Sequence, residues 1–152
     1  MVDGDLYGRP GRPQVLYVED EPTNLLLMQA LFRLRPHLHL VTATDGAEVT
    51  ALAPSIRPAL ILLDLRLPDC WGSDLLPQLR QRFRWRHVPA VAVTAEVEFD
   101  GSRSGFIETW HKPLDLKFVL ERLDRWLPDT VQAEHTGQHW RPPAADKFEA
   151  RA

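Results

Sequence analysis

Three carboxylates in this sequence stand directly after apolar runs. Glu19 and Asp20 follow "QVLYV", and Asp64 follows "ALILL". Short apolar runs of this kind predict buried strands, so the three acids are expected where strands leave the core. Three neighbouring carboxylates cannot all stay ionised without a positive charge among them. Mg²⁺ is a hard cation that takes one or two carboxylates, so we expect a magnesium site formed by Glu19, Asp20 and Asp64.

Two further residues suit the chemistry of a phosphoryl group. Thr94 ends the apolar run "AVAVT", and Lys112 follows "FIETWH". A metal ion and an ammonium group neutralise charge on phosphoryl oxygens, and a threonine hydroxyl can donate a hydrogen bond to one of them. Asp64 would then act as the nucleophile and form an acyl phosphate. The catalytic residues expected on this basis are Asp64, Thr94 and Lys112.

Apolar runs alternate with helical patterns along the chain and must bring these residues together. Runs such as "ALILL" and "VPAVAV" are apolar on both faces, which suits parallel strands covered by helices on each side. Right-handed crossovers then predict an α/β fold with a doubly wound, five-stranded parallel sheet, whose ligands bind beyond the carboxyl ends of the strands. We expect strands at 14–19, 38–43, 58–64, 88–94 and 106–111, and helices at 22–35, 45–55, 72–83 and 114–127.

The last two helices carry specific expectations. Pro77 should kink or delay the helix at 72–83. The helix at 114–127 would expose Phe118 or Trp126 if its leucines face the sheet, and an exposed aromatic there favours a homodimer. The leucines of this pattern are Leu116, Leu120, Leu123 and Leu127.

Composition limits the organisation and the partners of the chain. Its 152 residues give room for one domain at 14–127, with an N-terminal tail at 1–13 and a polar C-terminal tail at 128–152. The net charge of −3 argues against nucleic acid or an anionic membrane surface as a partner. Cys70 is the only cysteine, and it is a passive loop thiol or, less in keeping with its surroundings, a redox handle. With no apolar leader or spanning segment in the sequence, a cytoplasmic location is expected.

Four motifs together resemble the receiver domain of bacterial two-component response regulators. They are "VLYVEDE", "LILLDLRLPDCWG", "AVTAE" and "HKPL", in that order. The resemblance covers residues 14–127 and implies a flavodoxin-like strand order, 2-1-3-4-5, with helices on both faces. It also implies phosphorylation by a sensor histidine kinase with Mg²⁺ as cofactor, and a cis peptide bond between Lys112 and Pro113.

The same resemblance assigns roles to residues. Asp64 would be the phosphoacceptor, Asp20 a direct metal ligand and Glu19 an outer acid of the metal site. The main-chain carbonyl of Arg66 would be a further metal ligand. The phosphoryl group would be contacted by Thr94 and Lys112.

The chain departs from the family pattern between Thr94 and Lys112. This interval is short, and residues 96–105 have little apolar periodicity, so the fourth helix is expected to shrink to about one turn or to become a loop. The switch position, which is usually a bulky aromatic, is Thr109, followed by Trp110. Either Trp110 or His111 carries the switch, or the usual coupling between Thr94 and an aromatic ring is absent.

Two oppositely charged residues flank the site. Arg66 stands two residues after Asp64, and Glu96 stands two residues after Thr94. We expect Arg66 and Glu96 to pair across the mouth of the site, and we hypothesise that the pair slows entry of the water that hydrolyses the acyl phosphate.

The preferred function is a stand-alone response regulator that signals by protein contacts or dimerisation and has no enzymatic turnover beyond its own phosphorylation and dephosphorylation. A phosphotransfer intermediate or phosphate sink in a relay is the nearest alternative.

A small aspartyl-phosphate phosphatase is less suitable, because such enzymes carry an acid where this chain has Arg66. A flavodoxin-like electron carrier would need a phosphate loop, and the acids of "EDEPTN" would repel that phosphate. A scaffold that works without phosphorylation is a further alternative, which the intact motif set disfavours.

Overall fold

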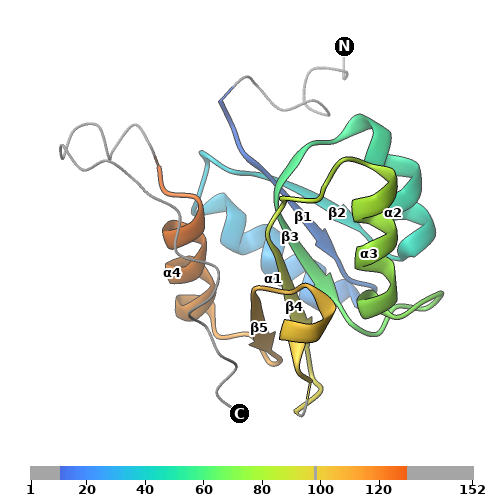
Figure 1. Ribbon diagram of the computed structural model, residues 1–152. Coiled ribbons are helices and arrows are strands. Elements are labelled where there is room, and N and C mark those ends of the chain that lie inside the picture. Colours follow the sequence, from blue (N-terminus) through green and yellow to red (C-terminus); the bar gives the residue numbers. More distant parts are fainter. Residues whose placement is uncertain (1–10, 98, 130–152) are drawn as a thin grey trace.

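The computed structural model describes residues 11–97 and 99–129 and contains one five-stranded parallel sheet (Figure 1). The strands lie in the order β2-β1-β3-β4-β5, which confirms the predicted doubly wound fold and strand order. Both predicted tails fall almost wholly outside the described residues. The strands are β1 (Gln14–Val18), β2 (His39–Ala43), β3 (Pro58–Asp64), β4 (Ala90–Thr94) and β5 (Glu108–His111).

Helices cover both faces of the sheet. In Figure 1, α1 and α4 lie on one side of the strands and α2 and α3 on the other. Successive side chains of a strand point to opposite faces, so each strand contributes to both cores. The helices are α1 (Pro22–Arg33), α2 (Gly46–Leu52), α3 (Gly72–Arg82) and α4 (Leu116–Trp126), and the 3₁₀ turns are η1 (Ala53–Ser55) and η2 (Gly101–Ser104).

The two cores have separate members. The core under α1 and α4 contains Val15, Tyr17, Leu60, Leu62 and Trp110, together with Met28 of α1 and Leu123 of α4. The core under α2 and α3 contains the intervening strand residues, such as Leu16, Ile61 and Leu63, with Leu76 of α3. Burial of strands on both faces explains the continuous apolar runs of the sequence.

Two of the helices, α2 and α4, begin at an aspartate that caps them. Asp45 accepts a hydrogen bond from the backbone N–H of Glu48 at the start of α2, and Asp115 accepts one from Phe118 at the start of α4. Such caps satisfy backbone donors that have no partner within the helix. The start of α3 at Gly72 is not delayed by Pro77, and the helix continues through this residue to Arg82.

Among its described residues, the crossover from β4 to β5 contains η2 and no α-helix, which confirms the predicted shortening of the fourth helix. Four residues of 3₁₀ helix rise only about 8 Å, since the rise is about 2.0 Å per residue. The crossover is fixed instead by aromatic packing, because the rings of Phe99 and Phe106 meet edge to face at 5.9 Å.

The buried face of α4 differs from the predicted one. Leu116 is 47% exposed and Phe118 is 41% exposed, whereas Trp126 is buried. The expectation for Phe118 is therefore confirmed and that for Trp126 and Leu116 is wrong. The buried residues of α4 follow i, i+3, i+4 and i+7 and are Val119, Arg122, Leu123 and Trp126. One of them is an arginine, which a hydrophobic pattern does not detect.

A buried carboxylate explains why α4 buries a different face from the predicted one. Glu108 of β5 is 8% exposed and accepts hydrogen bonds from the indole N–H groups of Trp110 and Trp126, both at 2.9 Å. It also forms an ion pair with Arg122. A buried carboxylate is costly unless donors surround it, so these contacts select the face of α4 that packs on β5.

Within the described residues, no helix combines the length and the apolar character needed to cross a bilayer.

Candidate functional site

Four predicted site residues, Glu19, Asp64, Thr94 and Lys112, lie at the carboxyl ends of β1, β3, β4 and β5. Asp64 ends β3 and is paired in register with Val93, so the next residue of β4, Thr94, lies beside it on the same rim. The backbone N–H of Lys112 donates to the carbonyl of Thr94 at 2.8 Å, which places Lys112 just beyond β5. The parallel register therefore brings together residues that are up to 93 positions apart in the chain.

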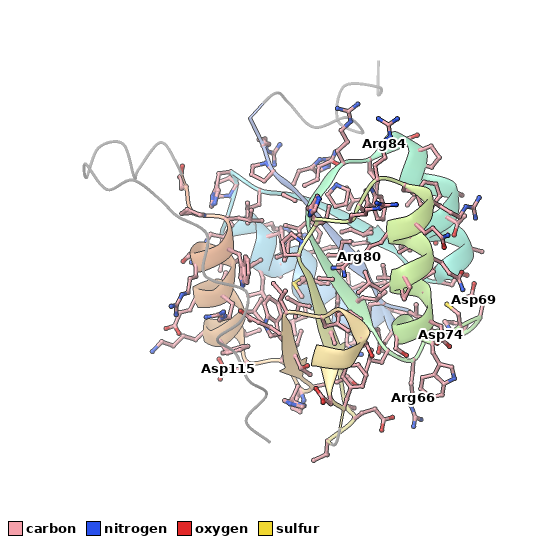
Figure 2. The ribbon with its side chains drawn as sticks, in the orientation of Figure 1. Arg66, Asp69, Asp74, Arg80, Arg84 and Asp115 are labelled. Carbon is pink, nitrogen blue, oxygen red and sulfur yellow. The ribbon has the colours of Figure 1, made fainter. Side chains whose placement is uncertain are left out.

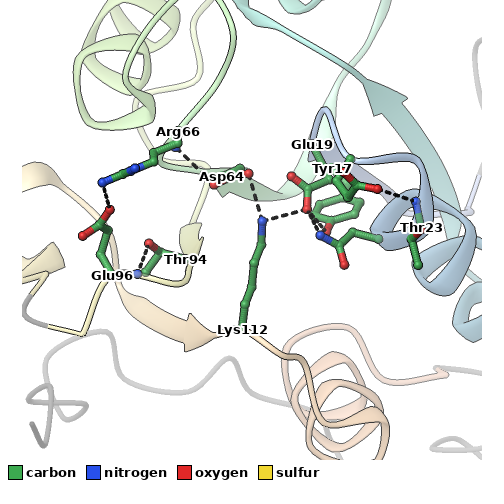
Figure 3. A network of polar contacts seen from close by, with 10 residues as sticks. Tyr17, Glu19, Thr23, Asp64, Arg66, Thr94, Glu96 and Lys112 are labelled. Carbon is green, nitrogen blue, oxygen red and sulfur yellow. Dashed lines mark hydrogen bonds and ion pairs between the residues drawn. The ribbon is translucent and has the colours of Figure 1, made fainter.

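The ammonium group of Lys112 lies between two carboxylates (Figure 3). Its Nζ donates to Oε1 of Glu19 at 2.7 Å and to Oδ2 of Asp64 at 2.9 Å. Burial by itself lowers the pKa of Lys112, but the hydrogen bonds to Glu19 and Asp64 outweigh it, so this pKa is raised. Lys112 therefore stays charged and holds both acids in place. The peptide bond between Lys112 and Pro113 is cis, as the resemblance implied.

Glu19 is fully buried, and its two carboxylate oxygens differ in their hydrogen-bond partners. Its Oε1 accepts from Asn24 at 2.6 Å and from Tyr17 at 3.4 Å in addition to Lys112, while Oε2 has no hydrogen-bond partner among the described residues. Burial, followed by hydrogen bonding with Asp64, raises the pKa of Glu19 to about 7, although Lys112 opposes this shift. An orphaned buried oxygen of this kind calls for a cation or a water molecule.

Tyr17 and Asn24 are site residues that the sequence reasoning missed. Tyr17 lies two residues before Glu19, so the period of a strand places both on one face. Asn24 lies in the first turn of α1, which begins immediately after the acidic pair. Burial raises the pKa of Tyr17 well above its ordinary value, and the charges of Glu19 and Asp64 add to that shift, so its hydroxyl remains a donor.

The three predicted acids form a group that fits a divalent cation. Glu19, Asp20 and Asp64 each offer a carboxylate oxygen, and these oxygens lie within 4.8 Å of one another. Asp20 is exposed, so the group opens to solvent. Hard oxygen donors with room for water are typical of Mg²⁺ sites. The residues present therefore fit magnesium, and the orphaned Oε2 of Glu19 supports that fit.

The loop after Asp64 folds back on itself. Oδ1 of Asp64 accepts from the backbone N–H of Arg66 at 3.1 Å, and Gly72 donates to the carbonyl of Leu65 at 2.8 Å. A Cβ atom at position 72 would lie only 2.3 Å from the carbonyl oxygen of Asp64. Gly72 is thus required for the first turn of α3 to approach the strand end.

Asp69 ties the same loop to α2. Its two carboxylate oxygens accept from the backbone N–H groups of Gly46 and Ala47, both at 2.9 Å. The neighbouring thiol of Cys70 has its pKa raised to about 11, by burial first and then by Asp69. Such a thiol is rarely ionised at neutral pH, which favours the passive role for Cys70.

An ion pair spans the mouth of the site. Arg66 contacts Glu96 at 2.5 Å, and its guanidinium also lies over the ring of Trp71, 5.5 Å from the centroid. The two charged side chains are 70% and 41% exposed. The backbone N–H of Glu96 donates to Oγ1 of Thr94 at 2.9 Å, so this loop connects the mouth to the rim hydroxyl.

The residues considered for a switch point in different directions. Trp110 is buried and donates to Glu108, within the core under α1 and α4. Thr109 lies on the opposite face of β5, and its Oγ1 would be 3.1 Å from a Cβ atom at Gly101 of η2. His111 is exposed. Thr109 therefore faces the shortened crossover, whereas Trp110 faces the core under α1 and α4.

Comparison with known proteins agrees with this fold. The family model of the response regulator receiver domain matches residues 15–124, and the chain therefore belongs to that family. It is a receiver domain of the two-component response regulator class, similar to DivK and CheY proteins.

Two curated relatives illustrate the range of this similarity. The polar-differentiation response regulator DivK of Brucella anthropi is 30% identical over 119 residues, which are 76% of this chain and 96% of that protein. The DNA-binding dual master transcriptional regulator RpaA of Synechocystis is 28% identical over 131 residues, which are 84% of this chain but only 54% of that protein.

Solved structures show the same architecture. The receiver domain of a Pseudomonas aeruginosa sensor histidine kinase has a magnesium ion coordinated in its active-site cleft; it is 26% identical, with a TM-score of 0.67, and the match covers 77% of this chain and 98% of that one. The chemotaxis response regulator CheY4 of Vibrio cholerae also has a TM-score of 0.67 at 23% identity, covering 74% of this chain and 97% of that one, and supports the fold alone.

Proposed function

We propose that this receiver domain accepts a phosphoryl group on Asp64 from a phosphohistidine of a sensor histidine kinase. The observation that carries the proposal is the position of Lys112, whose ammonium donates to Asp64 and Glu19 at once. A carboxylate held in this way at the end of a buried strand is fixed for attack at phosphorus. The P–N bond of the phosphohistidine would break, a P–O bond to Asp64 would form, and the imidazole would leave with a proton.

Residues of the rim can stabilise the negative charge of the incoming phosphoryl group. Thr94 Oγ1 accepts the N–H of Glu96, so its own hydrogen is available to donate to a phosphoryl oxygen. The ammonium of Lys112 already contacts the carboxylate of Asp64 and can also contact an oxygen of the phosphoryl group added there. Glu19, Asp20, Asp64 and the main-chain carbonyl of Arg66 are the proposed ligands of Mg²⁺, which would supply positive charge opposite the phosphoryl oxygens.

We further propose that the output is a protein contact and not catalytic turnover. Phe118 and Leu116 of α4 are exposed apolar side chains next to β5, and the ring of Phe118 stacks edge to face on Trp110 at 5.9 Å. This patch suits a homodimer or a partner protein. A phosphotransfer intermediate would use the same rim, while a phosphatase is disfavoured because Arg66 occupies the position of its second acid.

The proposal is tested by phosphorylation with acetyl phosphate and Mg²⁺, followed by intact mass spectrometry. The wild-type chain is expected to gain one phosphoryl group, and Asp64→Asn is expected to gain none because its amide is not a nucleophile. Asp74→Asn, an exposed acid of α3, is the matched control and should behave as the wild type. An unmodified wild type, or equal modification of Asp64→Asn, would refute the proposal.

A further inference from the structure

A groove of about 520 Å³ lies at the end of the sheet opposite the acidic rim. It is formed where β3, β4 and β5 begin and where α4 ends. Since β3 has seven residues at about 3.3 Å each, the groove is roughly 20 Å from Asp64. Figure 2 shows Arg84 of the neighbouring loop at the end of the molecule opposite Arg66.

This basic groove has an apolar floor and a cationic border. Val88, Ile107 and Trp126 contribute apolar surface, and Arg80, Arg86 and His87 contribute the border, with no acid among the lining residues. Grooves of this size, with mostly apolar walls and a few polar groups, are typical of binding sites.

The positive charge of the border is not neutralised within the described residues. The segment "RQRFRWRH" (80–87) carries four arginines, and none of them forms an ion pair there. The chain as a whole has a net charge of −3, so this concentration of arginines is local. A local field of this sign attracts carboxylates.

Arg80 is the member of the border that is most in need of a partner. Its Nη2 donates to the carbonyl of Val88 at 3.0 Å, but its buried Nε has no hydrogen-bond partner among the described residues. A Cβ atom at Gly105 would lie 2.7 Å from Nη1, so glycine at a φ of +84° is what admits the guanidinium. A half-buried guanidinium without a carboxylate is costly, and its donors suit a carboxylate.

We propose that the basic groove binds an acidic segment of a partner protein. One apolar side chain of that segment would lie against Val88, Ile107 and Trp126, and flanking carboxylates would pair with Arg80 and Arg86. The arginines at 82 and 84 extend the positive surface beyond the groove, which suits a chain of several carboxylates better than one small anion. The apolar floor suits a peptide side chain better than a phosphate backbone.

The proposal is tested by fluorescence anisotropy on the full chain. The probe is a short fluorescein-labelled peptide with glutamates on both sides of one phenylalanine, and a second peptide has serine in place of the phenylalanine. We expect saturable binding of the first peptide, and binding of the second weakened by about tenfold or more because the apolar contact is lost. Reversal of one border charge, in Arg86→Glu, should also weaken the first peptide by about tenfold.

Arg33→Glu is the matched control, because Arg33 is an exposed arginine on α1 and its reversal changes the net charge equally. It should leave the affinity within about twofold of wild type, the difference that long-range screening permits. The proposal is overturned if the phenylalanine peptide shows no saturable binding at millimolar concentration, or if Arg33→Glu weakens it as much as Arg86→Glu does. It is also overturned if a single-stranded oligonucleotide binds more tightly than the phenylalanine peptide and loses that affinity in Arg86→Glu. Self-association of the wild type in sedimentation experiments that is lost in Arg86→Glu would overturn it as well.

Discussion

At the scale of residues, the geometry of the rim depends on Lys112. One ammonium satisfies two buried carboxylates, which come from strands that do not adjoin β5. Its charge offsets part of the repulsion between Glu19 and Asp64, and the remaining repulsion is what a divalent cation would remove.

The protonation of Glu19 predicts how metal binding depends on pH. The pKa of Glu19 is raised to about 7, chiefly by burial, so the carboxyl gains a proton as the pH falls below that value. Since Mg²⁺ binds the ionised form, its dissociation constant should rise about tenfold between pH 8 and pH 6. A Mg²⁺ titration followed by tryptophan fluorescence measures this. Glu19→Gln should lose this pH dependence, and an unchanged slope in that variant would assign the proton to another group.

Arg66 offers a second prediction at this scale. Removal of its side chain in Arg66→Ala opens the mouth beside Glu96, so the phosphorylated chain should lose its phosphoryl group faster. The pair is largely exposed and is worth at most about 1 kcal/mol, so the rate should rise by no more than about fivefold. Decay followed by intact mass spectrometry gives the rate, with Arg33→Ala as control. An unchanged rate in Arg66→Ala would show that the pair does not restrict water.

At the scale of elements, β5 and α4 are joined by a buried polar network. Glu108 accepts hydrogen bonds from side chains of both α4 and β5, and the indole of Trp110 is part of this network. Trp110 is therefore held by a hydrogen bond and by the core, whereas Thr109 faces η2.

The network predicts a large loss of stability when its acceptor is removed. Glu108→Ala leaves a buried guanidinium and two indole N–H groups without this acceptor, so the free energy of unfolding should fall by about 3–5 kcal/mol. Urea denaturation measures the change. The double variant Glu108→Leu/Arg122→Leu should recover part of the loss, because no charge then remains buried. A loss below about 1 kcal/mol in Glu108→Ala would mean that the network contributes little.

At the scale of the whole molecule, the two ends of the sheet carry opposite charge. Carboxylates gather where the strands end, and arginines gather where β3 and β4 begin. The exposed aromatic surface of α4 lies on neither end but on a side of the sheet, beside the edge strand β5. The surfaces proposed for phosphoryl transfer, for self-association and for an acidic partner are therefore separate from one another.

Self-association is predicted to depend on Phe118. With beryllofluoride and Mg²⁺ as a mimic of the phosphoryl group, light scattering should give the mass of two chains for the wild type. Phe118→Ala should remain at the mass of one chain, because truncation of a central aromatic commonly costs an interface about 2 kcal/mol or more. Leu26→Ala, which removes an exposed apolar side chain on α1, is the control. If Leu26→Ala prevented dimerisation as strongly as Phe118→Ala, or if the wild type remained a monomer, the interface would not be on α4.

Several features could be predicted from local sequence because their physical cause is local. Apolar runs define buried strands, and an acid that follows such a run stands at the strand end, which locates Glu19 and Asp64. The alternation of strands and helices then implies a parallel sheet whose carboxyl ends meet. The short interval before Lys112 predicts the loss of a helix, since too few apolar positions remain to form its buried face.

Other features were decided only by tertiary structure. The sequence of α4 favoured a leucine face, but Glu108 selected a face with Arg122 and Trp126, because a buried carboxylate requires donors that come from another element. The contacts of Tyr17 and Asn24 with Glu19, and the basic groove itself, likewise depend on which segments lie side by side. Local sequence determines what each segment can bury or expose, whereas the pairing of distant polar groups determines which of these options the folded chain uses.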